Sequence, residues 1–156
     1  DAVEEIGFLI RLINEIRYIR AEMNVPLSAK PSLHIRGASD LQPRAIAGQQ
    51  TALLRMARLE GHAIVETFTK GSARSSVDGI DIGLPLADIL DLEAEAARLQ
   101  KEIGSVSAEI EKLTKKLDNA GFIAKAPAEV VAENRRRLDE ENTKLAGLTA
   151  ALRRVD

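Results

Sequence analysis

The most regular pattern of apolar residues lies in the last 65 residues of the 156-residue chain. Its apolar positions alternate at intervals of four and three residues, at Leu92, Ala96, Leu99, Ile103, Val106, Ile110, Leu113 and Leu117. Such a seven-residue repeat is typical of a coiled-coil helix. A second repeat carries Val131, Leu138, Leu145 and Leu152. Because helices joined by a short connection pack antiparallel, residues 91–156 are predicted to form an antiparallel helical hairpin, here called the arm.

The connection between the two predicted helices contains helix-breaking residues. Asn119 and Gly121 interrupt the first repeat, and either residue suits a left-handed C-cap. Pro127 stands at the predicted first position of the second helix. Phe122 is expected to close the end of the hairpin as an apolar plug, and contact with a base or ribose is the alternative. On the second repeat, the polar Asn134 is expected to loosen or register the packing.

Residues 1 to about 23 are predicted to form a helix that is apolar around most of its circumference. One helical face carries Ile6, Leu9, Ile10, Ile13 and Ile16, and further apolar residues, Phe8, Leu12 and Ile19, lie off that face. Helices of this kind are normally buried on several sides. The residues that follow can cover one side, so we expect further partners for this helix. Since Asp1 already lies within the helical pattern, we expect the chain to be a piece of a longer protein.

The middle of the chain has the pattern of a small α+β unit. Alternating residues predict a strand over 32–36, and strong β formers predict a second over 62–69. Between them a helix is expected over 41–59, capped by Asp40 and bent at Gly48. Asp78-Gly79 predicts a tight hairpin turn between two further strands. The predicted fold class is α+β: an isolated helix (1–25), a β-α-β-β unit with one covering helix (26–90) and the arm (91–156).

Composition excludes several classes of function. The chain has no Cys, which removes disulfides, thiol catalysis and Cys-type zinc sites and is compatible with the cytoplasm. His34 and His62 are too few for a His-rich metal site and are expected to be ordinary strand residues. Aromatic residues make up 3%, too few for a nucleic-acid site built on base stacking. No signal peptide or membrane span is predicted, and no catalytic constellation stands out.

Charge is distributed unevenly although its sum is small. The 22 basic and 24 acidic residues give a formal charge of −2, but the segment from Lys112 to Arg137 holds seven basic and three acidic residues. Antiparallel folding places these cations at the far end of the arm, here called the basic tip (residues 112–137). Two interpretations stay open. The tip is either a solvated surface with intrahelical pairs, such as Glu133 with Arg136 or Arg137, or a site that neutralises phosphates of a polyanion.

Three stretches of sequence resemble bacterial valyl-tRNA synthetases. The strongest match covers residues 115–131, which read KKLDNAGFIAKAPAEVV. Residues 87–102 resemble the start of the C-terminal arm of that family. Residues 16–26, IRYIRAEMNVP, resemble the last helix of its anticodon-binding bundle. The resemblance extends over essentially the whole chain.

The resemblance implies a role in binding tRNA without catalysis. Members of the family are class I synthetases that attach valine to tRNA with ATP and magnesium, and their catalytic signatures are absent here. No catalytic residue, cofactor or metal site is therefore expected in this chain. In the family the arm contacts the outer corner of tRNA. The candidate RNA-binding residues are Lys112, Lys115, Lys116, Asn119, Phe122, Lys125, Arg135, Arg136 and Arg137.

The expected partners are tRNA and the upstream domains of the same protein, with no membrane. Weak self-association is expected through the helix at residues 1–23. The alternative function is a coiled-coil assembly module that recruits another protein chain and does not bind RNA.

Overall fold

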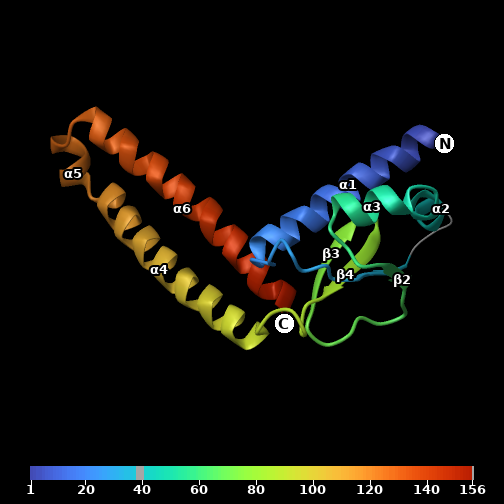
Figure 1. The fold of residues 1–156 in the computed structure, drawn as a ribbon. Helices are drawn as coiled ribbons and strands as arrows, with labels where there is room; N and C mark the ends of the chain where they lie inside the picture. Colours follow the sequence, from blue (N-terminus) through green and yellow to red (C-terminus); the bar gives the residue numbers. More distant parts are fainter. Residues whose placement is uncertain (38–40, 156) are drawn as a thin grey trace. The chain divides into compact units, whose positions relative to one another are not determined.

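The structure, a computed structural model, describes residues 1–37 and 41–155. In chain order its elements are α1 (Ala2–Glu22), β1 (Leu33–Arg36), α2 (Leu41–Gly48), α3 (Gln50–Met56), β2 (His62–Ile64), β3 (Ser72–Val77), β4 (Ile80–Pro85), α4 (Leu92–Asp118), α5 (Ala120–Lys125) and α6 (Ala128–Val155) (Figure 1). The predicted α+β class is confirmed. The predicted cap Asp40 lies outside the described residues.

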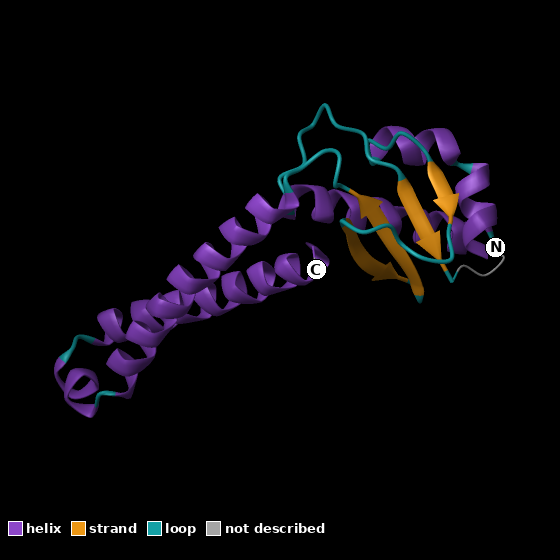
Figure 2. Cartoon of the chain, turned by 90° about the horizontal axis from the view of Figure 1, so that it is seen from below, coloured by secondary structure: helices purple, strands orange, loops and turns teal. Residues whose placement is uncertain are grey.

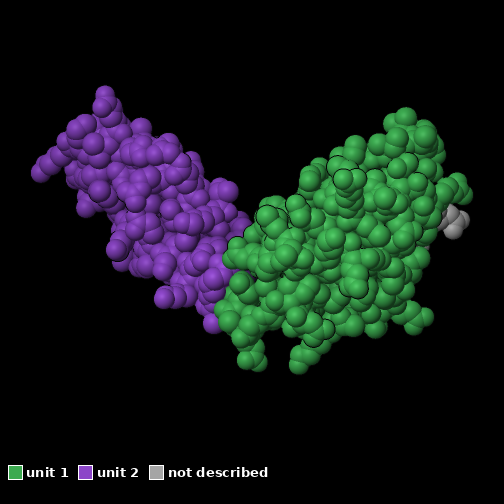
Figure 3. All heavy atoms as spheres, in the orientation of Figure 1, with its two compact units in different colours: residues 1–95, 154–156 green, residues 96–153 purple. Residues whose placement is uncertain are grey.

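The chain divides into two compact units, which Figure 3 distinguishes by colour. Unit 1 contains residues 1–95 and the C-terminal residues from 154, and unit 2 contains residues 96–153. Unit 1 holds α1 and the whole sheet, and unit 2 holds most of the arm. Among the described residues, no helix is both long and apolar enough to cross a membrane.

The sheet of unit 1 has four strands in the order β2-β1-β4-β3. The pair β1–β2 is parallel, and the other two pairs are antiparallel. Asp78 and Gly79 connect β3 to β4 with φ angles of 49° and 82°, which a two-residue hairpin turn of the predicted kind requires. The prediction of a mainly antiparallel sheet with this hairpin is therefore confirmed.

The second strand is shorter than the sequence predicts. β2 ends at Ile64, because β1 beside it has only four residues, and the last bond to β1 runs from Val65 N to Ile35 O (2.8 Å). The following segment leaves the sheet edge, and Phe68 packs against β4 instead. A Cβ at Gly83 would lie 2.7 Å from Phe68 Cδ1, so a side chain at that position would displace the ring. Phe68, one of the β formers after residue 64, thus covers the sheet rather than extending it.

Helix α1 packs against α2, α3 and β3, so it does not stand apart from the small unit. Its covered side is made of Phe8, Leu12, Ile16 and Ile19, each fully buried. Ile6 and Ile10, which lie on the predicted apolar face, are 53% and 54% exposed. The unit thus covers one side of α1, as expected, but the covered side includes the residues that lie off the predicted face. The helix expected over 41–59 was predicted to break or bend at Gly48; it breaks there and divides into α2 and α3.

In unit 2, α4 and α6 run antiparallel, as predicted (Figure 2). Leu99, Val106 and Leu113 are buried at seven-residue intervals, and the remaining predicted seam positions are half-buried. Asn134 is also buried, and its Nδ2 donates to Val130 O (2.7 Å) in the preceding turn. This hydrogen bond of Asn134 therefore lies within α6 and does not cross the seam.

The connection of the arm differs from the prediction. It contains the short helix α5, and Asn119 caps that helix with extended backbone (φ −81°, ψ 108°) rather than a left-handed conformation. Its Oδ1 accepts a hydrogen bond from Phe122 N (3.2 Å). Asn119 breaks α4 because an Asn side chain competes well for the first free N–H groups of the next helix. Pro127 lies one residue before the start of α6.

Candidate nucleic-acid interface

An ion pair across the arm sets the register of its two long helices. Arg137 Nη2 on α6 lies 2.9 Å from Glu109 Oε1 on α4. Because the helices run antiparallel, each residue after Glu109 on α4 lies opposite a residue before Arg137 on α6. Lys112 therefore lies opposite Asn134, and Lys116 lies opposite Val130. Lys112 therefore lies close to Arg135 along the arm, as predicted, whereas Lys115 and Lys116 lie about one helical turn nearer to α5.

The end of the tip is closed by α5 and its aromatic side chain. Phe122 is half-buried, and Lys116 Nζ lies 5.0 Å from the centroid of its ring. A cation over an aromatic face is attracted by the ring quadrupole, so Lys116 and Phe122 form one surface. Lys125 ends the same short helix and is exposed. The side-chain oxygen of Asn119 is already engaged as the cap of α5, which favours a structural role for it.

Three candidate cations are engaged with carboxylates on the arm itself. Lys115 Nζ lies 3.0 Å from Glu111 Oε1, and Arg137 makes the cross-helix pair with Glu109. Arg136 pairs with both Glu133 and Glu140. Its hydrogen bonds lower the pKa of the Glu133 carboxyl, and the Glu133 carboxylate in turn raises the pKa of Arg136. The intrahelical pair expected between Glu133 and Arg136 is therefore present, and the choice between a solvated surface and a phosphate site stays open.

The other four candidate cations have no carboxylate partner among the described residues. They are Lys112, Lys116, Lys125 and Arg135, and all four are exposed. An exposed pair contributes little to stability, so the three paired cations can also exchange a carboxylate for another anion. The tip thus has four cations that are available to bind an anion and three that first have to break a weak ion pair. They are spread over about three helical turns.

The sequence did not show which cations are paired. The spacing of Glu111 with Lys115 and of Glu133, Arg136 and Glu140 was visible as three- and four-residue intervals. The pair of Arg137 with Glu109 was not, because these residues are 28 positions apart in sequence and their contact depends on the register of α4 against α6.

Metal-binding clusters are absent from the part of the chain that the structure describes. The described residues contain no group of three or more His, Cys, Asp or Glu side chains that could hold a metal ion. In unit 1, Asp78 and Asp81 each pair with an arginine, Arg11 and Arg36 respectively, which lowers the pKa of both carboxyls. Carboxylates held in this way stay ionised and are poor general acids.

Residues 91–156 match the family described as the valyl tRNA synthetase tRNA binding arm. Related proteins extend the similarity over nearly the whole chain. The valine–tRNA ligase of Caulobacter vibrioides is 44% identical over 155 residues, which cover 99% of this chain and 17% of that protein. The chain belongs to the valyl-tRNA synthetase family.

Two further relatives are also valine–tRNA ligases. The valine–tRNA ligase of Agrobacterium fabrum is 44% identical over 154 residues, or 99% of this chain and 16% of its own length. That of Carboxydothermus hydrogenoformans is 39% identical over 139 residues, or 88% of this chain and 16% of its own length. The chain therefore spans about one sixth of the length of the valyl-tRNA synthetases that it matches, and its basic tip lies within the tRNA binding arm of the family.

Proposed function

We propose that the basic tip binds tRNA through backbone phosphates and thereby helps to hold tRNA on a valine–tRNA ligase. The observation that carries the proposal is a set of four exposed cations that have no carboxylate partner among the described residues. All four lie in the segment that matches the tRNA binding arm family. Lysine and arginine contacts to phosphate supply affinity and orientation with little reading of base sequence. Phe122, half-buried beneath Lys116, supports the tip surface in this proposal.

The longer protein that contains this chain is proposed to ligate valine to tRNA with ATP and magnesium. No group of three or more potential metal ligands occurs among the described residues, and the proposal assigns the ATP and magnesium chemistry to other parts of the ligase. The chain's share of the reaction is thus to bind and orient tRNA, and the catalytic residues belong to other parts of the ligase.

A charge-reversal pair tests the tip directly. Lys116→Glu with Lys125→Glu is expected to weaken tRNA binding by roughly ten- to a hundredfold at about 0.1 M salt, since each change replaces an attraction to phosphate by a repulsion. The measurement is fluorescence anisotropy of labelled tRNA over a salt series. If about four phosphates are neutralised, log K of the unchanged chain should fall against log salt with a slope near −3 to −4.

The matched control reverses two cations elsewhere on the same helices. Lys101 on α4 and Lys144 on α6 are exposed and lie outside the tip. Lys101→Glu with Lys144→Glu makes the same change in net charge and should weaken binding much less. Equal loss in both variants would show that only net charge matters. A tight oligomer that ignores tRNA in sedimentation would support the alternative, an assembly module.

The uncovered side of α1 is proposed to contact the rest of the ligase. Val3, Ile6 and Ile10 lie on that side and are 76%, 53% and 54% exposed. Apolar side chains grouped in this way favour a partner surface. In the separate chain the same side is expected to cause weak self-association, which sedimentation at rising concentration would detect.

A further inference from the structure

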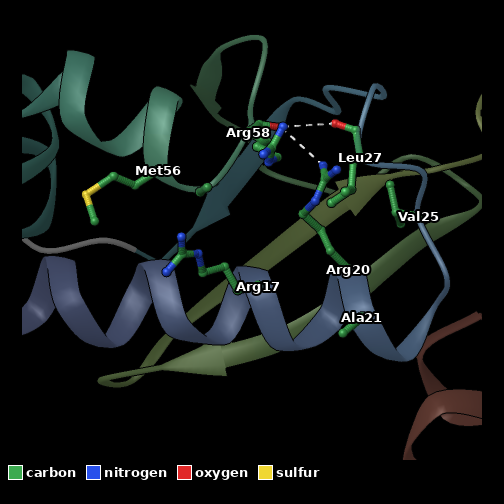
Figure 4. Close-up of a pocket in the computed structure, with 8 residues that line it drawn as sticks. Arg17, Arg20, Ala21, Val25, Leu27, Met56 and Arg58 are labelled. Atoms are coloured by element: carbon green, nitrogen blue, oxygen red, sulfur yellow. Dashed lines mark hydrogen bonds between the residues drawn. The ribbon is translucent and has the colours of Figure 1, made fainter.

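A basic pocket lies in unit 1, between the C-terminal half of α1 and the end of α3. It encloses about 320 Å³, and three arginines, Arg17, Arg20 and Arg58, line it together with apolar residues that include Leu27 and Met56. Among the described residues, no acidic side chain lines it. Figure 4 shows Arg17 and Arg20 extending from α1 toward the segment that carries Arg58. Three arginines thus line one pocket, and the described part of the chain contributes no carboxylate to its lining.

Arg20 brings a buried positive charge to this pocket. Its side chain is only 6% exposed, and it donates hydrogen bonds to the backbone oxygens of Pro26 (2.9 Å), Ala29 (2.9 Å) and Arg58 (3.1 Å). These carbonyl groups carry partial charges only, and no carboxylate pairs with Arg20 among the described residues. Burial, followed by repulsion from Arg58, lowers the pKa of Arg20. The guanidinium charge is therefore hydrogen-bonded but not neutralised.

Arg58 occupies a backbone position that glycine normally fills. It follows the C-terminal end of α3 with φ 54°, and Leu59 N bonds back to Leu54 O (2.8 Å), which is the Schellman arrangement. The left-handed conformation crowds the Cβ of most residues, so glycine is preferred there. Arg58 instead directs Nη1 toward Leu27 O (3.4 Å) beside the pocket.

Arg17 completes the cluster from the exposed side. It is solvent-exposed and makes no ion pair among the described residues. An arginine fork matches the oxygens of a phosphate or carboxylate in two parallel hydrogen bonds. The pocket has more room than one phosphate needs, and the exposed side chains of Leu27 (71%) and Met56 (48%) border it. This combination suits a phosphate that carries an attached sugar.

We propose that the Arg17–Arg20–Arg58 pocket binds a backbone phosphate of RNA, with the adjoining ribose against Leu27 and Met56. The inference rests on the proposed function, because it assigns a second contact with tRNA to unit 1, separate from the basic tip. Arg20 forms the floor of the site and is held in place by its three carbonyl partners. Arg17 and Arg58 supply the accessible guanidinium groups.

The test removes the two accessible cations and leaves Arg20 in place. In the 156-residue chain, Arg17→Gln with Arg58→Gly should raise the Kd for tRNA about tenfold near 0.1 M salt and make the salt slope shallower by about one. Arg58→Gly relieves the left-handed strain, so the melting temperature should stay within about 4 °C of the unchanged chain. The matched control, Arg44→Gln with Arg55→Gln, removes two exposed cations outside the pocket and should change Kd less than about twofold.

Two outcomes overturn the inference, and a single variant replaces the double one if the double one does not fold. Unchanged tRNA affinity in the Arg17→Gln, Arg58→Gly chain, while Lys116→Glu with Lys125→Glu still weakens binding, leaves the proposed function standing without this pocket. If the double variant unfolds, Arg17→Gln alone decides, because Arg17 makes no hydrogen bond that supports the fold among the described residues. Inorganic phosphate can also be titrated while the NMR signals of the arginine Nε–H groups are followed. If these signals shift to saturation but the substitutions do not affect tRNA binding, the pocket is a site for free anions only.

Discussion

The two units of this chain bury their side chains in different ways. The largest fully buried side chains, from Phe8 to Leu84, lie in unit 1, where helices and a sheet enclose a core. Unit 2 is a layer of two helices, and the side chains that it buries among the described residues are Leu99, Val106, Leu113, Asn134 and Ala151. Two helices alone can enclose only the seam between them, so most of the arm's surface stays in contact with water.

This difference explains where charge is available for binding. On the arm, Arg136 and its two glutamates are all more than half exposed, so their pairing is weak and exchangeable. In unit 1, Arg20 is almost fully buried, and no carboxylate of the described residues neutralises its charge. In the two proposals above, the exposed tip binds phosphate through many weak contacts, whereas the pocket binds it through a few arginines that are held in place. The comparison leads to three experiments, which alter the core, the seam and the ion pairs.

The largest effect is expected from the core of unit 1. Phe8→Ala should lower the free energy of unfolding by about 3–5 kcal/mol, because it removes a fully buried ring and leaves a cavity. The control on the same helix is Ile10→Ala, at a side chain that is 54% exposed, and it should cost less than about 1 kcal/mol. Urea denaturation measures both. Similar losses would mean that the uncovered side of α1 is buried in solution.

A change of opposite sign is expected at the seam of unit 2. Asn134→Leu should stabilise the arm by about 1 kcal/mol, since a buried amide that bonds only to its own helix is replaced by an apolar side chain. Asn142→Leu on the exposed side of α6 is the matched control and should change little. Hydrogen exchange of arm amides measures local stability. Faster exchange in Asn134→Leu would show that Asn134 supports the packing.

Much of the fold was predictable because it depends on local pattern. The seven-residue repeat predicted the buried positions of α4, and Asp78-Gly79 predicted the hairpin turn, since each depends on residues close in sequence. The end of β2 was not predictable in the same way. It depends on the length of β1 and on the packing of Phe68 over Gly83, contacts that residue propensities do not contain.

The candidate site was predictable in composition but not in pairing. The sequence showed which cations gather at the tip, because helical spacing and an antiparallel connection bring them together. It did not show that Arg137 reaches Glu109, which depends on register between helices. The basic pocket escaped sequence analysis altogether. Arg17 and Arg20 lie near a helix C-terminus, where basic residues are common and do not indicate a site. Only folding brings Arg58 close to them.

The smallest effect is expected from breaking one exposed ion pair in each unit. Arg11 and Asp78 are 67 residues apart in sequence and join α1 to the hairpin through two short hydrogen bonds (2.7 and 2.9 Å). Arg11 lowers the pKa of Asp78 below its ordinary value of 3.8. A carboxyl with a lowered folded-state pKa stabilises the fold above the unfolded value, and this contribution is lost as pH falls through the folded value. Wild-type stability should therefore decline more steeply below about pH 4 than that of Asp78→Asn.

Glu133→Gln in unit 2 is the matched comparison for that pair. Glu133 also has a lowered pKa, but its partner Arg136 is only three residues away on the same helix. Its loss should leave the acid unfolding of unit 1 unchanged, because an intrahelical pair ties together no separate elements. Asn suits the left-handed backbone at position 78, so Asp78→Asn tests charge and not turn geometry. Urea midpoints between pH 3 and pH 6 measure both variants; parallel pH profiles for wild type and Asp78→Asn would show that the Arg11–Asp78 pair contributes nothing to unit 1.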